Sequence, residues 1–234
     1  MQLPFFYINH YNPALKSFVL DEDNSRHIVQ VLRMQDGEQL HLTDGRGYLL
    51  IAEISNAHKK HCGVTVINEA FFSKTEPLVT IAISPLKNNS RFEWFLEKAT
   101  EIGVSAIVPL LCTRTEKQKL RAIRLQNILV SAMLQSRQCW LPVLEEPTTI
   151  NKFLASDLFS TTTEKYIAHC AEGQKLSFSA AKASALILIG PEGDFTEEEI
   201  TAALTAGCQP VTLGDTRLRT ESAGIVAAVK LKIP

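Results

Sequence analysis

The sequence predicts an α/β protein in two parts, a small β-barrel over residues 1–72 and a parallel α/β sheet over residues 73–234. Short strands separated by turn residues crowd the first part, which is typical of a compact barrel. Continuous apolar runs such as Val79–Ile83 appear in the second part, and such runs are typical of parallel strands buried on both faces. Helical segments lie between these runs, and this alternation predicts a parallel sheet.

The N-terminal part is expected to be mostly strand. The runs EQLHL and YLLIAEI lie on either side of Asp44–Gly47, which predicts a hairpin turn, and the runs FFYI and CGVTVI predict two further strands. Only Ser25–Leu32 has helical spacing, with Ile28, Val31 and Leu32 expected on one face.

The polar stretch Ser73–Pro77 marks the expected domain boundary, because the hydrophobic period changes after it. Ser90 and Glu93 have the spacing of a capping box, and Gly103 is expected to end the helix that begins there. A basic helix is expected over about 117–138. The further strands expected in this part are 106–111, 165–170, 186–190 and 210–214.

Two glycine-bearing turns dominate the C-terminal part, one after the strand that ends at Gly190 and one after the strand that ends at Gly214. We expect positive φ at Gly190 and Gly193, and a capping box at Thr196 and Glu199 that starts the next helix. Loops at the carboxyl ends of parallel strands converge, so the two turns are expected to form one small-molecule pocket. Either turn alone would more often be a simple connection.

Composition excludes several classes of protein. The chain of 234 residues is 45% hydrophobic, enough for a buried core, and it has no long apolar run or leader, so a cytoplasmic protein without a membrane segment is expected. The five cysteines are scattered without a CxxC pair, and no metal is predicted. The net charge is −1. Basic residues nevertheless gather between Cys112 and Cys139, where they either contact phosphates or form a solvated helix face.

Several motifs resemble one family. GPEGDF at Gly190–Phe195 and LGDTRLRTESA at Leu213–Ala223 resemble the C-terminal motifs of the ribosomal RNA small subunit methyltransferase E family, in the SPOUT class. The resemblance extends through 96–116, through QSR at 135–137 and through HIVQVLR at 27–33. The main departure is Asp194, where the family usually has glycine, and this adds a negative charge beside the expected cofactor.

The resemblance implies a SPOUT-type sheet with a deep trefoil knot, a PUA-like N-terminal barrel that holds RNA, and a homodimer. It implies S-adenosyl-L-methionine as cofactor and N3 of a uridine in the decoding region of 16S rRNA as target, within the assembled 30S subunit. The apolar stripe of Ile225, Val226 and Val229 would contribute to the dimer or, alternatively, to the core. The cofactor-binding residues implied are Leu188, Gly190, Pro191, Glu192, Gly193, Leu213, Gly214 and Leu218.

Catalytic roles fall on Arg219 as a cation that stabilises developing negative charge and on Glu221 as the base. Glu221 could instead form an ion pair with Arg217 or Arg219 that only fixes the loop. The residues expected to contact RNA are Arg26, Arg33, Lys87, Arg91, Arg114, Gln135 and Arg137. For Arg26 and Arg33 a plain surface position is the alternative, and for Gln135 helix-end packing or a dimer contact.

Two other functions remain open from the sequence. The chain could be a SPOUT enzyme with another RNA target, or a non-catalytic RNA-binding module if Asp194 prevents cofactor binding. The nucleotide-binding and hydrolase motifs GxGxxG after a strand, GxxxxGK[ST] and GxSxG are absent from the sequence.

Overall fold

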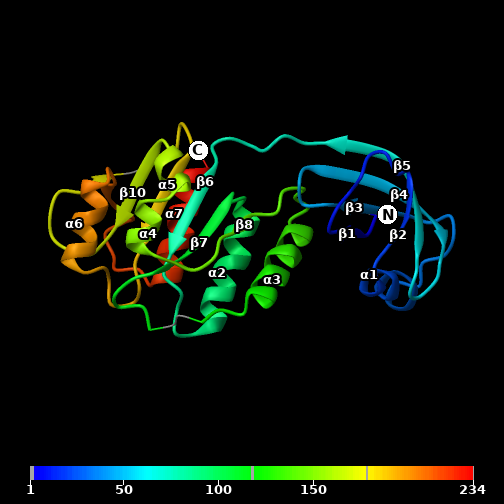
Figure 1. Cartoon of the computed structure of the whole chain (residues 1–234), viewed down its shortest axis with the longest axis horizontal. Coiled ribbons are helices and arrows are strands. Elements are labelled where there is room, and N and C mark those ends of the chain that lie inside the picture. The colour runs from blue at the N-terminus through cyan, green and yellow to red at the C-terminus, as the bar shows by residue number, and fades with distance from the viewer. Residues whose placement is uncertain (1–2, 117–118, 178, 234) are drawn as a thin grey trace. The chain divides into compact units, whose positions relative to one another are not determined.

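The computed structural model describes residues 3–116, 119–177 and 179–233 of the chain, and these fold into two compact units (Figure 1). One unit holds the chain up to Lys74 together with Met133–Leu141, and the other holds Thr75–Ala132 and the chain from Pro142 onward. The segment Met133–Leu141 lies in a part of the chain that the sequence assigns to the C-terminal domain.

The N-terminal unit is built on a five-stranded mixed sheet in the order β1-β3-β4-β5-β2. Strand β1 pairs with β3 in parallel, and the other pairs are antiparallel. The hairpin predicted around Asp44–Gly47 is confirmed, because it joins β3 to β4. The elements are β1 (Phe5–Tyr7), β2 (Ser17–Val19), α1 (Glu22–Arg26), β3 (Gln39–Thr43), β4 (Tyr48–Asn56) and β5 (Gly63–Phe71).

Helix α1 continues into a π-helical turn, His27–Val31, which confirms helical structure in this segment. Ile28 is fully buried in the core of the unit, together with side chains of β3, β4 and β5. The expectation for the rest of the face is wrong: Val31 and Leu32 are exposed. The wider π turn changes the angular step between residues, so a spacing count based on an α-helix misplaces them.

The C-terminal unit is a parallel sheet covered by helices on both faces, in the strand order β11-β13-β10-β12-β6-β7-β8, with β9 paired to β7. The strands are β6 (Val79–Ile83), β7 (Ala106–Leu111), β8 (Val143–Leu144), β9 (Thr148–Thr149), β10 (Glu164–Ala168), β11 (Leu176–Ser177), β12 (Ala185–Ile189) and β13 (Gln209–Thr212). The helices are α2 (Asn89–Ile102), α3 (Ala122–Gln135), α4 (Ile150–Leu154), α5 (Asp157–Thr161), α6 (Glu197–Thr205) and α7 (Thr220–Lys232).

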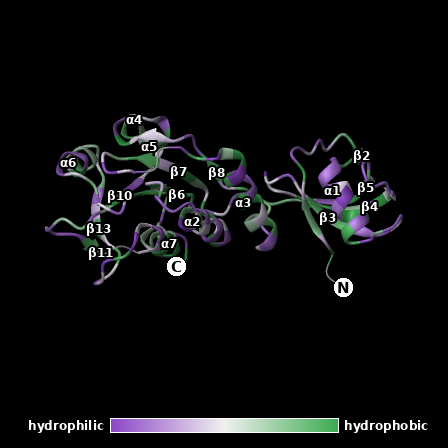
Figure 2. Ribbon diagram, turned by 90° about the horizontal axis from the view of Figure 1, so that it is seen from below, coloured by the Kyte–Doolittle hydropathy of each residue, from purple (hydrophilic) through white to green (hydrophobic). Residues whose placement is uncertain are grey.

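The central strands are buried on both faces, as their apolar runs predict: every residue of β6 and of β12 is buried. Helices α2 and α7 cover one face, and α4, α5 and α6 pack on the other through one apolar cluster. Figure 2 shows this layering, with α4 and α5 on one side of the sheet and α2 and α7 on the other. The knot that the resemblance implies stays a prediction.

Two helix starts differ from expectation. Helix α2 is capped by Asn88, whose side chain accepts from the Ser90 amide, so a capping box of Ser90 with Glu93 is wrong. Asparagine is as good a cap as serine, and it comes two residues earlier. Helix α3 begins at Ala122, later than the expected start at about 117. Residues 117 and 118 of the expected helix lie outside the described part of the chain. Among the described residues, no helix is long and apolar enough to cross a membrane.

Candidate active site

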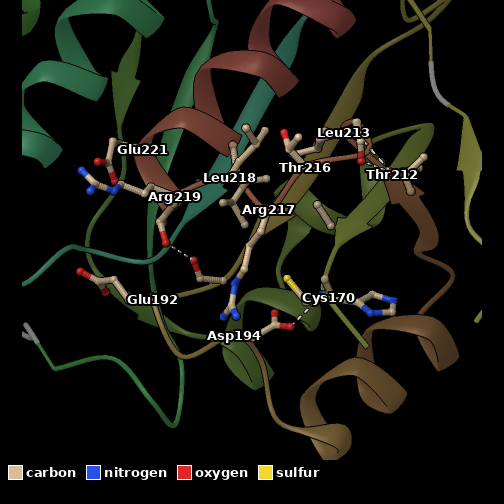
Figure 3. Close-up of a pocket in the computed structure, with 18 of the residues that line it drawn as sticks. Cys170, Glu192, Asp194, Thr212, Leu213, Thr216, Arg217, Leu218, Arg219 and Glu221 are labelled. Carbon is tan, nitrogen blue, oxygen red and sulfur yellow. Dashed lines mark hydrogen bonds between the residues drawn. The ribbon is translucent and has the colours of Figure 1, made fainter. Parts of the chain in front are cut away.

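A cavity of about 630 Å³ opens at the carboxyl ends of β10, β12 and β13 in the C-terminal unit. This volume lies in the range of small-molecule sites, and this edge of a parallel sheet is where such ligands bind. Both glycine-bearing loops line the cavity, as the sequence predicts, together with the loop after β10. Figure 3 shows side chains from all three loops around it.

The first loop follows β12 and turns at Gly190, which has no room for a side chain. A Cβ there would lie 3.0 Å from the Phe195 ring and 3.2 Å from the Phe195 amide nitrogen. The Thr220 hydroxyl donates to the Gly190 carbonyl at 3.0 Å, which ties the start of α7 to this turn. The expected positive φ at Gly190 and Gly193 is wrong, because neither is among the residues with positive φ. Close packing, not backbone handedness, requires glycine at position 190.

Asp194 carries the left-handed conformation in this loop, with φ of 65°. Its Oδ1 accepts from the Phe195 amide at 2.8 Å, and its Oδ2 accepts from the Cys170 amide at 2.7 Å (Figure 3). Aspartate tolerates this conformation better than most residues, because its short side chain bonds the local backbone. Asp194 therefore joins the loop after β12 to the loop after β10 across one wall of the cavity.

The loop after β7 supports the first loop from outside the cavity. The Arg114 guanidinium donates to the Gly193 carbonyl at 2.6 Å and to the Phe195 carbonyl at 3.3 Å. The buried Glu199 accepts from the Thr113 amide at 2.7 Å, and with Thr196 it forms the predicted capping box of α6, which is confirmed. Arg114, which the sequence suggests as an RNA contact, thus already bonds the protein backbone, although its side chain remains exposed.

The second loop follows β13 and runs to the start of α7. Gly214 has φ of +155°, and the Thr212 hydroxyl bonds both its carbonyl and its amide. Leu213 and Leu218 are half-buried against the cavity, whereas Arg217 and Arg219 are exposed at its edge. In Figure 3 the Arg217 side chain points toward Asp194. The loop therefore offers apolar contacts, backbone groups and cations to one ligand.

Glu221 lies in the first turn of α7 with its side chain only 9% exposed. Its Oε1 is 3.7 Å from Nε of Arg91, and its Oε2 is buried without a hydrogen-bond partner among the described residues. The expected pairing with Arg217 or Arg219 is wrong, since the ion pair of Glu221 is formed with Arg91 from α2. A buried carboxylate oxygen without a partner is costly unless a ligand or water completes it.

The loop after β10 is a part of the site that the sequence analysis missed. His169, Cys170 and Lys175 line the cavity, and both ring nitrogens of His169 are buried without a partner among the described residues. Burial lowers the pKa of His169, Lys175 lowers it further, and Asp194 acts in the opposite direction. The polar residues directly after the apolar run KYIA, in the same position as the two glycine turns, were the available clue.

The remaining predicted residues lie in several places. Leu188 is fully buried in the core beneath the cavity. Lys87 is exposed and pairs with Glu116 at 2.9 Å. In the N-terminal unit, Arg26 pairs with Glu22 at 3.0 Å, and Arg33 and Arg137 are exposed with left-handed backbone. Gln135 is exposed at the end of α3. Among the described residues, no group of three His, Cys, Asp or Glu side chains is placed to hold a metal ion.

Comparison with known proteins identifies the family to which both units are similar. The RNA methyltransferase domain model matches residues 74–232, and the RNA methyltransferase PUA domain model matches residues 20–67. Ribosomal RNA small subunit methyltransferase E of Synechocystis is 32% identical over 214 residues, which cover 88% of this chain and 69% of the relative. The chain belongs to the ribosomal RNA small subunit methyltransferase E family.

Solved structures of this family agree with the fold. A probable rRNA-methyltransferase from Porphyromonas gingivalis matches with a TM-score of 0.86 at 39% identity, over 97% of this chain and 95% of that chain. A ribosomal RNA small subunit methyltransferase E from Neisseria gonorrhoeae, solved bound to S-adenosyl methionine, matches with a TM-score of 0.84 at 28% identity, over 97% and 96%. The C-terminal unit is therefore a SPOUT-type methyltransferase domain, and the N-terminal unit is PUA-like.

Proposed function

We propose that this protein transfers a methyl group from S-adenosyl-L-methionine to N3 of a uridine in the decoding region of 16S rRNA. The observation that carries the proposal is the cavity of about 630 Å³ between the two glycine-bearing loops. The matching family member from Neisseria gonorrhoeae was crystallised with S-adenosyl methionine. A pocket of this size, held by three loops that bond one another, suits a cofactor of that size.

The lining fits the charges of this cofactor, which carries an ammonium and a carboxylate group on its methionine part and a positive charge on its sulfur. Acidic and basic groups are both present, and three buried polar atoms, two on His169 and one on Glu221, lack partners among the described residues. Of the residues implied to hold the cofactor, Gly190, Pro191, Glu192, Leu213, Gly214 and Leu218 line the cavity. Gly193 is outside the lining and supports the loop through its bond to Arg114, and Leu188 shapes the floor from the core. The lining charges are Arg91, Lys175, Glu192, Asp194, Asp215, Arg217, Arg219 and Glu221.

The bound cofactor supplies an electrophilic methyl group. N3 of uridine attacks well only once it has lost its proton, and Glu221 accepts that proton on its free Oε2. The negative charge left on the base is shared by N3, O2 and O4, and the Arg219 guanidinium stabilises it until the N–C bond forms. As that bond forms, the bond between the methyl group and sulfur breaks, and the charge on the base is neutralised. Arg91 holds the Glu221 carboxylate in place through Oε1, which leaves the other oxygen for the proton.

The RNA lies across exposed cations near the cavity mouth and on the N-terminal unit. Lys87 and Arg114 flank the first loop, and Arg91 lies at the cavity wall. Contacts from two units to different RNA segments favour a folded substrate, so we propose the assembled 30S subunit, which places the reaction in the cytoplasm. The further residues proposed to contact RNA are Arg26, Arg33, Gln135 and Arg137.

We also propose a homodimer that buries the outer face of α7. Ile225 and Val226 are half-buried and Val229 is 38% exposed, so this face carries apolar surface next to the cavity. Light scattering of the purified protein is expected to give twice the chain mass. A monomer at micromolar concentration would contradict this assembly.

The reaction is tested with labelled S-adenosylmethionine and two substrates prepared without the modification, 30S subunits and free 16S rRNA. We expect calorimetric binding of the cofactor and label transfer to the subunits, with less transfer to free rRNA. Cofactor binding without transfer to either substrate would mean another RNA target. Absence of cofactor binding would refute the enzyme and favour a non-catalytic module.

The residue roles are tested by Arg219→Ala and Glu221→Gln, with Arg219→Lys as the variant that keeps the charge. Loss of one such group is expected to lower kcat by about 10²- to 10³-fold, with cofactor affinity changed little. Arg219→Lys is expected to recover part of the loss. Full turnover of Arg219→Ala with unchanged cofactor affinity would show that the assignment is wrong.

A further inference from the structure

A cluster of aromatic and basic side chains lies on the N-terminal unit, and all of its members belong to that unit. We call it the Trp140 cluster, and its members are Arg46, Phe71, Phe72, Lys74 and Trp140. It joins three separate pieces of chain: the turn between β3 and β4, the end of β5, and the segment that follows α3. None of these residues has a role in the site described above.

Gly47 is the point where the three pieces meet. Its amide donates to the Cys139 carbonyl at 2.8 Å, and its carbonyl accepts from the Phe72 amide at 2.8 Å. A Cβ at Gly47 would lie 2.8 Å from both the Phe71 and the Trp140 ring, and its φ is +103°. The indole of Trp140 donates to the Phe72 carbonyl at 2.7 Å. These bonds hold the Trp140 indole at the end of β5, where its ring packs against the Phe71 ring.

Much of this aromatic surface remains open to solvent. Phe71 is 58% exposed and Phe72 is 50% exposed, although they are consecutive large apolar residues. Phe71 packs edge to face with Trp140, at 6.2 Å between ring centres, and with Tyr48 at 5.1 Å. Exposed apolar groups that gather in one patch, instead of occurring singly, are typical of binding surfaces.

The charge of the cluster indicates the class of partner. Nζ of Lys74 lies 4.8 Å from the centre of the Trp140 ring, and Arg46 forms a β-bridge with Trp140. Burial lowers the pKa of the His41 imidazole, and Arg137, three residues before Trp140, lies close enough to lower it further. Within the described residues, these three cations have no ion-pair partner. Aromatic rings interleaved with unpaired cations are the means by which proteins bind single-stranded nucleic acid, through base stacking and phosphate contacts.

We propose that the Trp140 cluster binds an unpaired stretch of RNA, with bases stacked on Phe71 and Phe72 and phosphates against Arg46, Lys74 and Arg137. This inference rests on the proposed function in one respect, that the substrate is RNA. An RNA duplex keeps its bases stacked inside, so it has no free base faces for the two rings. The cluster therefore selects single-stranded segments of the RNA, and it serves binding, not the methyl transfer itself.

The first test measures anisotropy of a fluorescent ten-nucleotide oligouridine with the full-length protein. The double variant Phe71→Leu with Phe72→Leu keeps apolar volume but removes the rings, and we expect binding to weaken by roughly 30-fold or more, about 5-fold or more for each of the two stacked bases. The matched control is Val31→Ala, which shortens an exposed side chain elsewhere on the same unit and is expected to change nothing. Thermal unfolding of each variant shows whether the fold is kept.

The second test uses tryptophan fluorescence. The chain has two tryptophans, so Trp94→Phe on α2 leaves Trp140 as the only indole. Oligouridine is expected to quench the fluorescence of Trp140 over the same concentration range in which the anisotropy change reaches its plateau. The Phe71→Leu/Phe72→Leu variant is expected to lose this quenching. Saturated anisotropy without any change at Trp140 would overturn the proposal, as would equal binding of an RNA duplex.

These readouts separate the cluster from the reaction. Quenching of Trp140 that depends on Phe71 and Phe72, in a protein that methylates no rRNA, would support the cluster and refute the proposed reaction. Methylation at the wild-type kcat and KM by the Phe71→Leu/Phe72→Leu variant, with oligouridine binding unchanged, would refute the cluster and leave the reaction standing.

Discussion

Replacing Asp194 by glycine, the residue that the family usually has there, tests how the cavity is held open. In the described part of the chain, its carboxylate is the only side chain that hydrogen-bonds the loop after β12 to the loop after β10. Asp194→Gly removes the acceptors of two amides, those of Phe195 and Cys170, and also removes the cost of a left-handed non-glycine residue.

The two effects oppose each other. A hydrogen bond to a charged group contributes about 1.5–3 kcal/mol when buried, but Cys170 is exposed and Asp194 is half-buried, so about 0.5–1 kcal/mol each is the appropriate value here. The loss is then about 1–2 kcal/mol. Glycine at φ of 65° recovers about 1 kcal/mol of backbone strain. We therefore expect the stability of the fold to fall by less than about 1 kcal/mol.

Cofactor affinity is also expected to fall, because two unlinked loops must be ordered again when the ligand binds. The bond that links the loops, from the Cys170 amide to Oδ2 of Asp194, contributes about 0.5–1 kcal/mol, which corresponds to S-adenosylmethionine binding that is roughly 2- to 5-fold weaker. Asp194→Asn is the control: it tolerates the same φ and keeps one acceptor oxygen, so an intermediate affinity is expected. Calorimetry gives the affinity, and amide hydrogen exchange at Cys170 is expected to be faster in Asp194→Gly. Equal or tighter binding by Asp194→Gly, with exchange at Cys170 unchanged, would refute this reasoning.

Two further predictions concern the scaffold. In Gly224→Ala, the new Cβ would lie 2.6 Å from the Phe95 ring and 2.8 Å from the Ile83 methyl. The free energy of unfolding, measured with urea, is therefore expected to fall by about 1–3 kcal/mol, and adding Phe95→Leu should recover part of that loss. An unchanged urea midpoint would contradict this packing. Glu93 accepts two hydrogen bonds from Arg124, and these bonds lower the pKa of its carboxyl from the ordinary value of 4.5. The contribution of this pair to stability is therefore complete above pH 4.5, and it is lost as the pH falls through the lower pKa that the carboxyl has in the folded protein. The stability difference between wild type and Glu93→Gln should narrow below pH 4.5, and a difference that stays constant would exclude the bond.

The parts of the fold that follow from local pattern were predictable. The runs at β6 and β12 are continuously apolar and are buried throughout, and the capping box of Thr196 with Glu199 forms as its spacing indicates. The spacing of Ser90 and Glu93 predicted a second capping box equally well, but that prediction was wrong, because Asn88 caps the helix from two residues earlier. Local rules locate an element well, but they choose poorly between neighbouring caps.

The site was predictable only in part. Its two glycine loops stand out in the sequence, yet glycine at position 190 is needed for contact with Phe195, and it is Asp194 that has positive φ. The partner of Glu221 is Arg91, which comes from a helix far away in the sequence, so no motif could pair them. His169 was missed because the strand expected over 165–170 included it, whereas β10 ends at Ala168. Tertiary contacts, not local composition, decide these three features.

The identity of the methylated atom defines the proposed reaction. We would isolate 16S rRNA from unmodified 30S subunits after incubation with the protein and S-adenosylmethionine, digest it to nucleosides, and measure them by mass spectrometry. We expect new 3-methyluridine, formed by wild type and strongly reduced with Arg219→Ala. A methyl group found on a ribose hydroxyl or on a different base, in place of 3-methyluridine, would contradict the proposed reaction.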